Sequence, residues 1–450
     1  MRKLLFTAAS LGLMLAVSAQ TNPAITSWLQ NTTTFGSHYV SGNSTVIKDN
    51  VLANVQKVQY SNDFVYINTH GIPAYPTGPF LDRNPSLATD QNAIFKIPLN
   101  PSKNTGTPST TTGGNIGVFV NGVALFDYRD GVSYNLRVAN DQGGPGGGRG
   151  DGVWNRDAIP AEMAGFDCSK GHPAMGNYHH HQNPSAFKLD QKVISTICNL
   201  YDADGLYSID SNKHSPLIGF AYDGFPIYGA YGYTNTNGTG GIARINSSYK
   251  LRSITARTHY ADGSDVTDGP TVNTRYPLGH YREDYEYKST NGHLDEHNGR
   301  FCVTPEYPKG IYAYFCTVDE NWNSAYPYAV GPTFYGNWAR RNVTSITETV
   351  EVYTKETTTS LNYQGIELKT NFSIFPNPAQ DFVAVQASGL VDNNIELELV
   401  TLKGEVIRSS TLKQGSTIWY IDTKTIYNGQ YLLRIVQGQY VSIKKVIIQK

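Results

Sequence analysis

Residues 216–229 read PLIGFAYDGFPIYG, which is an apolar run, an Asp-Gly pair, and a second run of apolar and aromatic residues. β-Branched and aromatic residues favour strands, and an Asp-Gly pair between two such runs is a strong signal for a tight hairpin. The stretch therefore predicts two antiparallel strands. Asp223 at the turn has two interpretations: its side chain caps the turn, or it serves as a hydrogen-bonding or ligand group elsewhere.

Similar short strand signals lie on both sides of this hairpin. Toward the N-terminus, residues 55–60 and 64–67 predict a strand, a turn and a second strand, and residues 116–123 predict a hairpin about Asn121-Gly122. Helical signals are few and fall in residues 160–164 and 183–199. The chain is therefore predicted to be mainly β.

The composition agrees with an exported β protein. The 450 residues include 31 tyrosines and 43 glycines, and only 16% are charged. Lys plus Arg number 36 and Asp plus Glu 37, so no basic surplus points to nucleic acid as a partner. The length predicts two or three domains.

The N-terminus carries the features of a signal peptide. Arg2-Lys3 precedes an apolar segment, residues 4–17, and Ser18-Ala19 follows at the position that a signal peptidase reads. We predict a signal peptide over residues 1–19, followed by a polar N-terminal arm or edge segment over residues 20–50. The apolar segment is too short to span a bilayer and no later run is long enough, so we expect no transmembrane anchor.

A change of composition marks the main domain boundary. After an alternating run at residues 347–353, the chain turns rich in Lys, Glu, Thr and Ser, which predicts a linker over residues 355–371. Residues 51–354 then form the principal domain. Residues 372–450 hold short strands at regular spacing and predict a small C-terminal β-sandwich.

A histidine run is the clearest chemical feature. Residues 176–181 read GNYHHH, and four of the eleven histidines lie between His172 and His181. In a strand, His179 and His181 project from the same face, and two convergent imidazoles are half of a zinc or copper site. The other interpretation is that stacked imidazoles and tyrosines fill an aromatic core or line a polar cleft.

A second polar stretch, residues 293–300, reads HLDEHNGR. His293 and His297 would share a face in a strand or in a helix, so either structure presents a chelating pair. His297 is a candidate ligand, and Asp295 or Glu296 could orient a ligand imidazole or act as a catalytic base. A solvated polar loop is the alternative.

The four cysteines are consistent with an oxidising compartment. Pairing of Cys168 with Cys198 and of Cys302 with Cys316 is favoured, because each pair lies in one sequence neighbourhood. Thiolate metal ligands are the alternative, although no C-x-x-C spacing supports them.

Several motifs in the same order resemble the YHYH domain family. They are Cys168 with GHP at 171–173, YHHH at 178–181, IGFAYDGFPIYG at 218–229, and LDEHNGR at 294–300. His180 stands where the family motif has its second tyrosine, while His179 and His181 stay in place. The resemblance implies a β-rich domain and a metal site, and it implies no particular reaction.

The C-terminal stretch resembles the type A sorting domain of type IX secretion. The motifs are FPNP at 375–378, LKG at 402–404, GQY at 429–431 and KKV at 444–446. The resemblance implies recognition by the type IX secretion machinery, passage across an outer membrane, removal of the domain, and release or lipopolysaccharide anchoring at the cell surface.

Two classes of function fit these features. One is an exported metalloprotein using His172, His179, His181 and His297, with a metal-dependent hydrolase or a copper oxidoreductase as its catalytic forms. The other is a surface module whose aromatic strands bind a glycan or a protein partner without catalysis.

Overall fold

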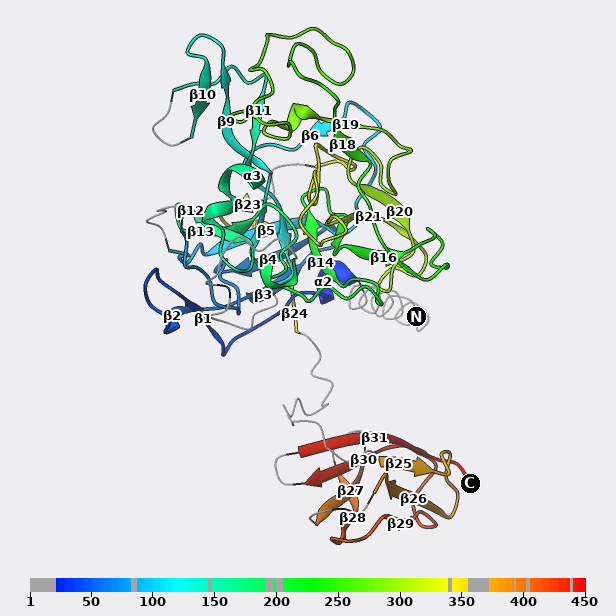
Figure 1. The fold of residues 1–450 in the computed structure, drawn as a ribbon. Coiled ribbons are helices and arrows are strands. Elements are labelled where there is room, and N and C mark those ends of the chain that lie inside the picture. The colour runs from blue at the N-terminus through cyan, green and yellow to red at the C-terminus, as the bar shows by residue number, and fades with distance from the viewer. Residues whose placement is uncertain are drawn as a thin grey trace, which may run out of the picture. The chain divides into compact units, whose positions relative to one another are not determined.

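A computed structural model describes residues 22–81, 87–144, 148–190, 198, 205–338, 342–354, 372–389, 391, 394–401, 405–437 and 440–450. The predicted signal peptide and linker therefore lie outside the described residues. The chain divides into two compact units, Met1–Tyr353 and Thr354–Lys450, and strands dominate both (Figure 1). The prediction of a mainly β protein is confirmed.

The first unit is built on an eight-stranded mixed sheet. Its strand order is β12 (Gly171–Ala174), β13 (Asn177–His180), β8 (Ala124–Phe126), β7 (Asn115–Phe119), β14 (Leu217–Ala221), β15 (Pro226–Tyr228), β21 (Ile311–Phe315) and β20 (Gly299–Cys302). A second sheet has the order β23 (Asn342–Val343), β5 (Ala93–Pro98), β4 (Phe64–Thr69), β3 (Val55–Tyr60) and β24 (Glu351–Tyr353). The two sheets share one hydrophobic core, to which Phe95 and Ile97 of the second sheet and Phe119 and Phe220 of the first contribute.

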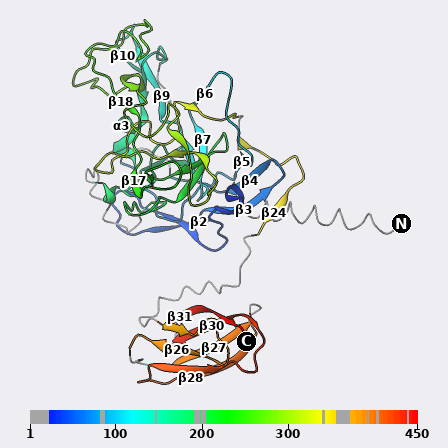
Figure 2. The same cartoon turned by 90° about the vertical axis from the view of Figure 1, so that its right-hand side faces the viewer.

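Smaller sheets and short helices complete this unit. The three-stranded sheet has the order β10 (Asn140–Gly143), β9 (Arg129–Asn135) and β11 (Asn155–Asp157), and in both views β9 and β10 stand at the opposite end of the unit from β2 and β3 (Figures 1 and 2). The two-stranded sheets pair β1 (Phe35–His38) with β2 (Ile47–Leu52), β16 (Tyr231–Tyr233) with β17 (Ile242–Arg244), β18 (Tyr249–Leu251) with β19 (Tyr285–Tyr287), and β22 (Thr333–Phe334) with β6 (Ser109–Thr110). The helical elements are α2 (Pro23–Thr26), α3 (Ala158–Glu162), η1 (Met163–Gly165), η2 (Phe187–Leu189) and η4 (Arg282–Asp284).

The two predicted hairpins form where their turn residues stand. β14 and β15 pair antiparallel, and Gly224 adopts a φ of 91° in the turn between them. β7 and β8 pair in the same way, with Gly122 at a φ of 78°. Positive φ is readily available to glycine, which explains why Asp-Gly and Asn-Gly specify these turns.

The N-terminal segment contributes to the core. Trp28 is 1% exposed, its ring centroid lies 5.4 Å from that of Phe220, and Ala24 and Ile25 are buried beside it. Residues 24–28 are thus packed rather than loose, because three apolar side chains within a polar sequence are enough to anchor it.

Helix α3 begins earlier than the sequence predicts. The side chain of Asp157 accepts a hydrogen bond from the backbone N–H of Ile159 at 3.0 Å and caps the helix, which begins at Ala158, two residues before Pro160. In the other predicted helical segment, residues 183–199, the structure has η2, and residues 191–197 lie outside the described residues.

The cysteines form one of the two predicted bonds. Cys168 and Cys198 are joined, with their Cα atoms 5.0 Å apart. The prediction for Cys302 and Cys316 is wrong, since both are buried free thiols. In the pairing of β20 with β21, Cys302 stands opposite Ile311, so Cys316 lies five residues further along, roughly 16 Å away at the rise of a strand. A disulfide requires Cα atoms within about 7 Å.

The second unit contains a three-stranded and a four-stranded sheet. The first has the order β25 (Phe372–Phe375), β26 (Phe382–Ala387) and β29 (Ile418–Asp422), and the second has the order β28 (Val406–Leu412), β27 (Ile395–Thr401), β30 (Gly429–Gln437) and β31 (Tyr440–Ile448). Alternating residues of β26 and β27, such as Val383, Val385, Leu397 and Leu399, are buried in one core. This arrangement confirms the predicted small β-sandwich.

Among the described residues, no helix has the length and apolar character needed to cross a membrane.

Candidate metal centre

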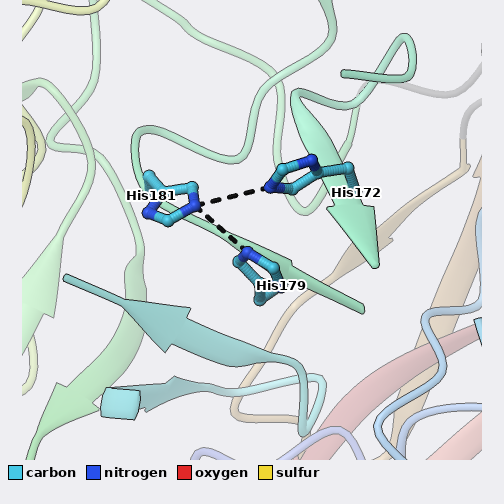
Figure 3. Close-up of side chains that lie close together, drawn as sticks. All are labelled: His172, His179 and His181. Carbon is cyan, nitrogen blue, oxygen red and sulfur yellow. Dashed lines mark hydrogen bonds between the residues drawn. The ribbon is translucent and has the colours of Figure 1, made fainter. Parts of the chain in front are cut away.

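The histidine run occupies one short hairpin of the large sheet. β12 and β13 pair antiparallel with His172 directly opposite His179, and Met175 and Gly176 turn the chain with positive φ. Directly opposed residues point to the same face of a sheet, and His181 joins His179 two positions on. Three imidazoles from two chain segments therefore converge (Figure 3).

The three rings meet through their Nε2 atoms. His179 Nε2 lies 3.1 Å from His181 Nε2, and His172 Nε2 lies 3.5 Å from the same atom (Figure 3). A set of potential ligand atoms, one from each ring, falls within 4.8 Å, and the three residues are 1–7% exposed. Among the described residues, His172, His179 and His181 form the group in which three potential metal ligands lie within 4.8 Å of one another.

The tautomers of two rings are fixed by the backbone. Nδ1 of His179 lies 2.8 Å from the carbonyl oxygen of Asn177, and Nδ1 of His181 lies 2.6 Å from that of Asp127. A carbonyl oxygen only accepts, so each Nδ1 carries the proton and each neutral ring leaves its Nε2 lone pair free. Those two lone pairs face each other, an arrangement that a cation between them would stabilise. An Nδ1–H donated to a carbonyl is also the usual support of a metal-ligating histidine.

A carboxylate stands beside the three rings. Glu162, the last residue of α3, places Oε2 3.2 Å from His172 Nε2 and 3.3 Å from His181 Nε2, and 25% of its side chain is exposed. Burial alone would raise the pKa of Glu162, but its contacts with His172 and His181 lower that pKa overall. The sequence did not identify Glu162, because its short helix gives no spacing signal that relates it to the histidine run.

The electrostatics differ from ring to ring. Burial, reinforced by the neighbouring imidazoles, lowers the pKa of His179 well below its usual value. Burial also acts to lower the pKa of His181, but the Glu162 carboxylate outweighs it and raises that pKa. His179 is thus held neutral, as a metal ligand must be.

Aromatic rings hold the imidazoles in place. Phe126 stacks on His179 with centroids 3.7 Å apart, and Phe166 meets His172 edge-on at 4.8 Å. Such packing restricts the rotamers of both histidines, so the convergence of the Nε2 atoms is built into the fold.

The opposite face of β13 has a structural role. Tyr178 donates to the buried carboxylate of Asp167 at 2.8 Å, and His180 Nε2 lies 2.8 Å from the hydroxyl of Tyr75. Burial lowers the pKa of His180 to about 3. Gly171 fits against both side chains, since a Cβ there would come within 2.5 Å of Tyr178 and 2.9 Å of His180.

The second polar stretch does not join the cluster. His297 Nδ1 contacts Thr333 Oγ1 at 2.6 Å, and His293 Nδ1 accepts from the backbone N–H of Asn246 at 3.0 Å. The group of converging ligands among the described residues contains His172, His179 and His181 without His297. The structure therefore does not bring His297 to this group: its stretch forms the loop before β20, where neighbours bond its side chains.

Asp295 and Glu296 are also separate from the histidine group. Asp295 Oδ1 accepts from the backbone N–H groups of His297 and Gly299 and from the hydroxyl of Tyr312. These bonds close the loop that leads into β20. The side chain of Glu296 is 58% exposed.

Asp223 combines its two proposed roles. Its carboxylate accepts from the backbone N–H of Phe225 within the hairpin, and also from Tyr314 Oη at 2.6 Å and from Gly336 N at 2.9 Å. Burial raises its pKa to about 6. Asp223 thus joins the turn to two distant segments by hydrogen bonds.

The fold and this site define a β-rich protein with a buried histidine cluster on one unit and a small β-sandwich as the other. Residues 94–327 match the family model described as YHYH protein, and the chain belongs to that family. Residues 373–449 match the secretion system C-terminal sorting domain. A domain of this kind directs a chain to the type IX secretion system, so the protein is exported and is secreted or displayed at the cell surface.

Other comparisons add little. No curated protein matches the chain. Among solved structures, the dimeric latent form of PorU from Porphyromonas gingivalis is similar at 21% identity and a TM-score of 0.15. The match covers 18% of this chain and 9% of the PorU chain.

Proposed function

We propose that this exported protein binds one transition-metal ion through Nε2 of His172, His179 and His181, with Glu162 as the fourth ligand. The observation that carries the proposal is the 3.1 Å approach of two Nε2 atoms whose rings both donate Nδ1–H to backbone carbonyls. With both rings neutral, the fold buries two opposed lone pairs, and either a metal ion or a proton taken up on Nε2 of His181 beside Glu162 relieves that opposition.

The donor set favours zinc or copper. Three imidazole nitrogens and one carboxylate suit these ions, whereas calcium and magnesium prefer oxygen ligands. The proposed ligands differ in access to solvent, because the side chain of Glu162 is 25% exposed and those of His172 and His181 are 8% and 4% exposed. Oε2 of Glu162, which faces the rings, is itself buried, so water or a substrate would reach the ion from the Glu162 side once this carboxylate moves.

A catalytic role is the second candidate, and the exposure of Glu162 favours it. A carboxylate at the solvent side of an ion can yield its position to water or a substrate, or take up a proton from it. Zinc there would support hydrolysis, and copper would support oxygen or electron-transfer chemistry.

Metal content of the untagged mature chain tests the proposal. We expect elemental mass spectrometry after dialysis without chelator to find one zinc or copper per chain, and none in His179→Ala. Circular dichroism of the variant checks that it is folded, and His179→Gln provides a larger polar replacement if alanine unfolds it. His293→Ala is the matched control and should keep its metal. A metal-free native chain, or an unchanged content in folded His179 variants, would overturn the proposal.

A further inference from the structure

A second site of different character lies on the same unit. A cavity of about 540 Å³ opens between the β18–β19 pair and the segment from Val318 to Tyr328. Its volume is within the range of small-molecule pockets, roughly 300–1,000 Å³. None of the proposed metal ligands lines it.

Tyrosine rings make one wall of this cavity. Tyr285 and Tyr326 are stacked with centroids 4.0 Å apart and planes within 3°, and Tyr249 meets Tyr326 edge-on at 5.4 Å. Tyr328 lies beside Tyr326, and its hydroxyl donates to the buried Asp157. Tyr249 and Tyr285 are half-buried, while Tyr326 and Tyr328 are buried. Tyr249 and Tyr285 therefore supply the aromatic surface that a ligand can reach, and the buried Tyr326 and Tyr328 hold it rigid, so little side-chain entropy is lost on binding.

The rest of the lining is polar and balanced in charge. It includes two cations, Arg244 and Lys250, and two carboxylates, Asp319 and Glu320, so its formal charges cancel. Oδ1 of Asn246 and Oγ of Ser324, both on lining residues, are buried and have no hydrogen-bond partner among the described residues. Buried polar atoms are rarely left unpaired. Rotation of the Asn246 or Ser324 side chain about one bond would turn its oxygen toward a ligand in the cavity.

We propose that this cavity is a binding site for a neutral oligosaccharide. A pyranose ring has C–H faces that lie against aromatic rings and an edge of hydroxyl groups that give and accept hydrogen bonds. The tyrosine wall matches the first property, and the amide and hydroxyl groups match the second. The cancelling charges favour an uncharged ligand over a phosphate, an acidic sugar or a basic peptide.

Titration of the chain without its predicted signal peptide, residues 20–450, with neutral trisaccharides tests this inference. The probes are maltotriose, cellotriose, mannotriose and N,N′,N″-triacetylchitotriose. Isothermal titration calorimetry measures the binding of each. We expect at least one to bind, and Tyr249→Ala to weaken that binding by about 10-fold or more through loss of ring contact. Ser324→Val should weaken trisaccharide binding less than Tyr249→Ala does. Because Ser324→Val leaves the tyrosine wall intact, it tests the cavity if the tyrosine variant does not fold.

Two further arms make the result decisive. Tyr427→Ala in the C-terminal unit is the matched control, since that side chain is 87% exposed and lies outside the cavity. His179→Ala, which should remove the metal, should leave trisaccharide binding unchanged, so the two proposals fail separately. The inference would be overturned if none of the four probes bound at ligand concentrations on the order of 10 mM. It would also be overturned if binding were unchanged in both Tyr249→Ala and Ser324→Val. If a tyrosine-rich peptide, tested in the same way, bound the cavity while none of the sugars did, the inference would be overturned as well.

Discussion

Two stretches of this chain contain nearly the same chemical groups and build different structures. Residues 168–198 hold two cysteines and four histidines, and residues 293–316 hold two cysteines and two histidines. The first stretch forms a disulfide and a cluster of three imidazoles. The second supplies two strands of the large sheet, with its thiols free and its histidines bonded to nearby groups.

Register is what separates the two stretches. In the first, a two-residue turn places His172 opposite His179, so the rings from both strands meet. In the second, the strand pairing sets Cys302 opposite Ile311, and the histidines precede the paired residues. Residue types therefore identify groups capable of metal binding, while the pairing of strands decides which of them converge.

The largest expected effect is on the metal itself. His181→Ala removes the imidazole that approaches both other rings, and its Nε2 is the shared atom of the two contacts within the cluster. We expect metal content to fall from one ion per chain to none, measured by elemental mass spectrometry. A folded His181→Ala protein with full metal content would show that the first stretch is not a metal site.

The disulfide of the first stretch gives the next largest effect. Cys168 and Cys198 are 30 residues apart, and closing a loop of that length stabilises the fold by roughly 3–4 kcal/mol in the chain-entropy estimate. We expect Cys168→Ser to lower the free energy of unfolding by about that amount in urea titrations.

Thiol counting compares both stretches in one assay. Denatured native protein should show two reactive thiols, from Cys302 and Cys316, and Cys168→Ser should show three. Cys302→Ser should show one and keep the Cys168–Cys198 bond. A count of zero in the denatured native chain would contradict the free thiols of the second stretch.

A smaller effect is expected from the carboxylate next to the cluster. Glu162→Gln keeps the size of the side chain but removes the charge that lies 3.2 Å from His172 and 3.3 Å from His181. We expect the affinity for the metal to fall by about 10- to 100-fold, measured by competition with a chelator. Glu296→Gln in the second stretch is the control and should leave affinity unchanged. Equal affinities in both variants would remove Glu162 from the ligand set.

Much of the fold follows from local sequence. The Asp223-Gly224 and Asn121-Gly122 turns, the alternating strands and the C-terminal sandwich all follow from short-range signals, because turn chemistry and side-chain alternation are properties of a few neighbouring residues. The pairing of His179 with His181 is of the same kind. The convergence of His172 with His179 and His181 depends on the register of the β12–β13 hairpin. The turn residues restrict that register but do not determine it.

The remaining site residues could not be predicted for a physical reason. Glu162 reaches the cluster from a short helix whose sequence gives no distance to the hairpin, and the carbonyl of Asp127 that orients His181 belongs to a residue 54 positions away. Such contacts depend on how elements pack. The same limit explains the wrong pairing of Cys302 with Cys316, which sequence proximity favoured and strand register prevents.

The smallest expected effect is the sharpest test of the comparison. His297 is a histidine of the second stretch that is as well buried as His172, at 8% and 7% exposure, so burial alone does not distinguish them. What distinguishes them is the partner: His297 Nδ1 contacts the hydroxyl of Thr333 at 2.6 Å, whereas His172 Nε2 faces a second imidazole and a carboxylate. We expect His297→Ala to leave the metal content at one ion per chain and to cost about 1 kcal/mol of stability for the lost hydrogen bond, plus the loss of ring packing. Metal analysis and urea unfolding of the same preparation measure both quantities. If the metal were lost while the fold remained, His297 would belong to the ligand set after all, and convergence in the hairpin would not be sufficient to define the site.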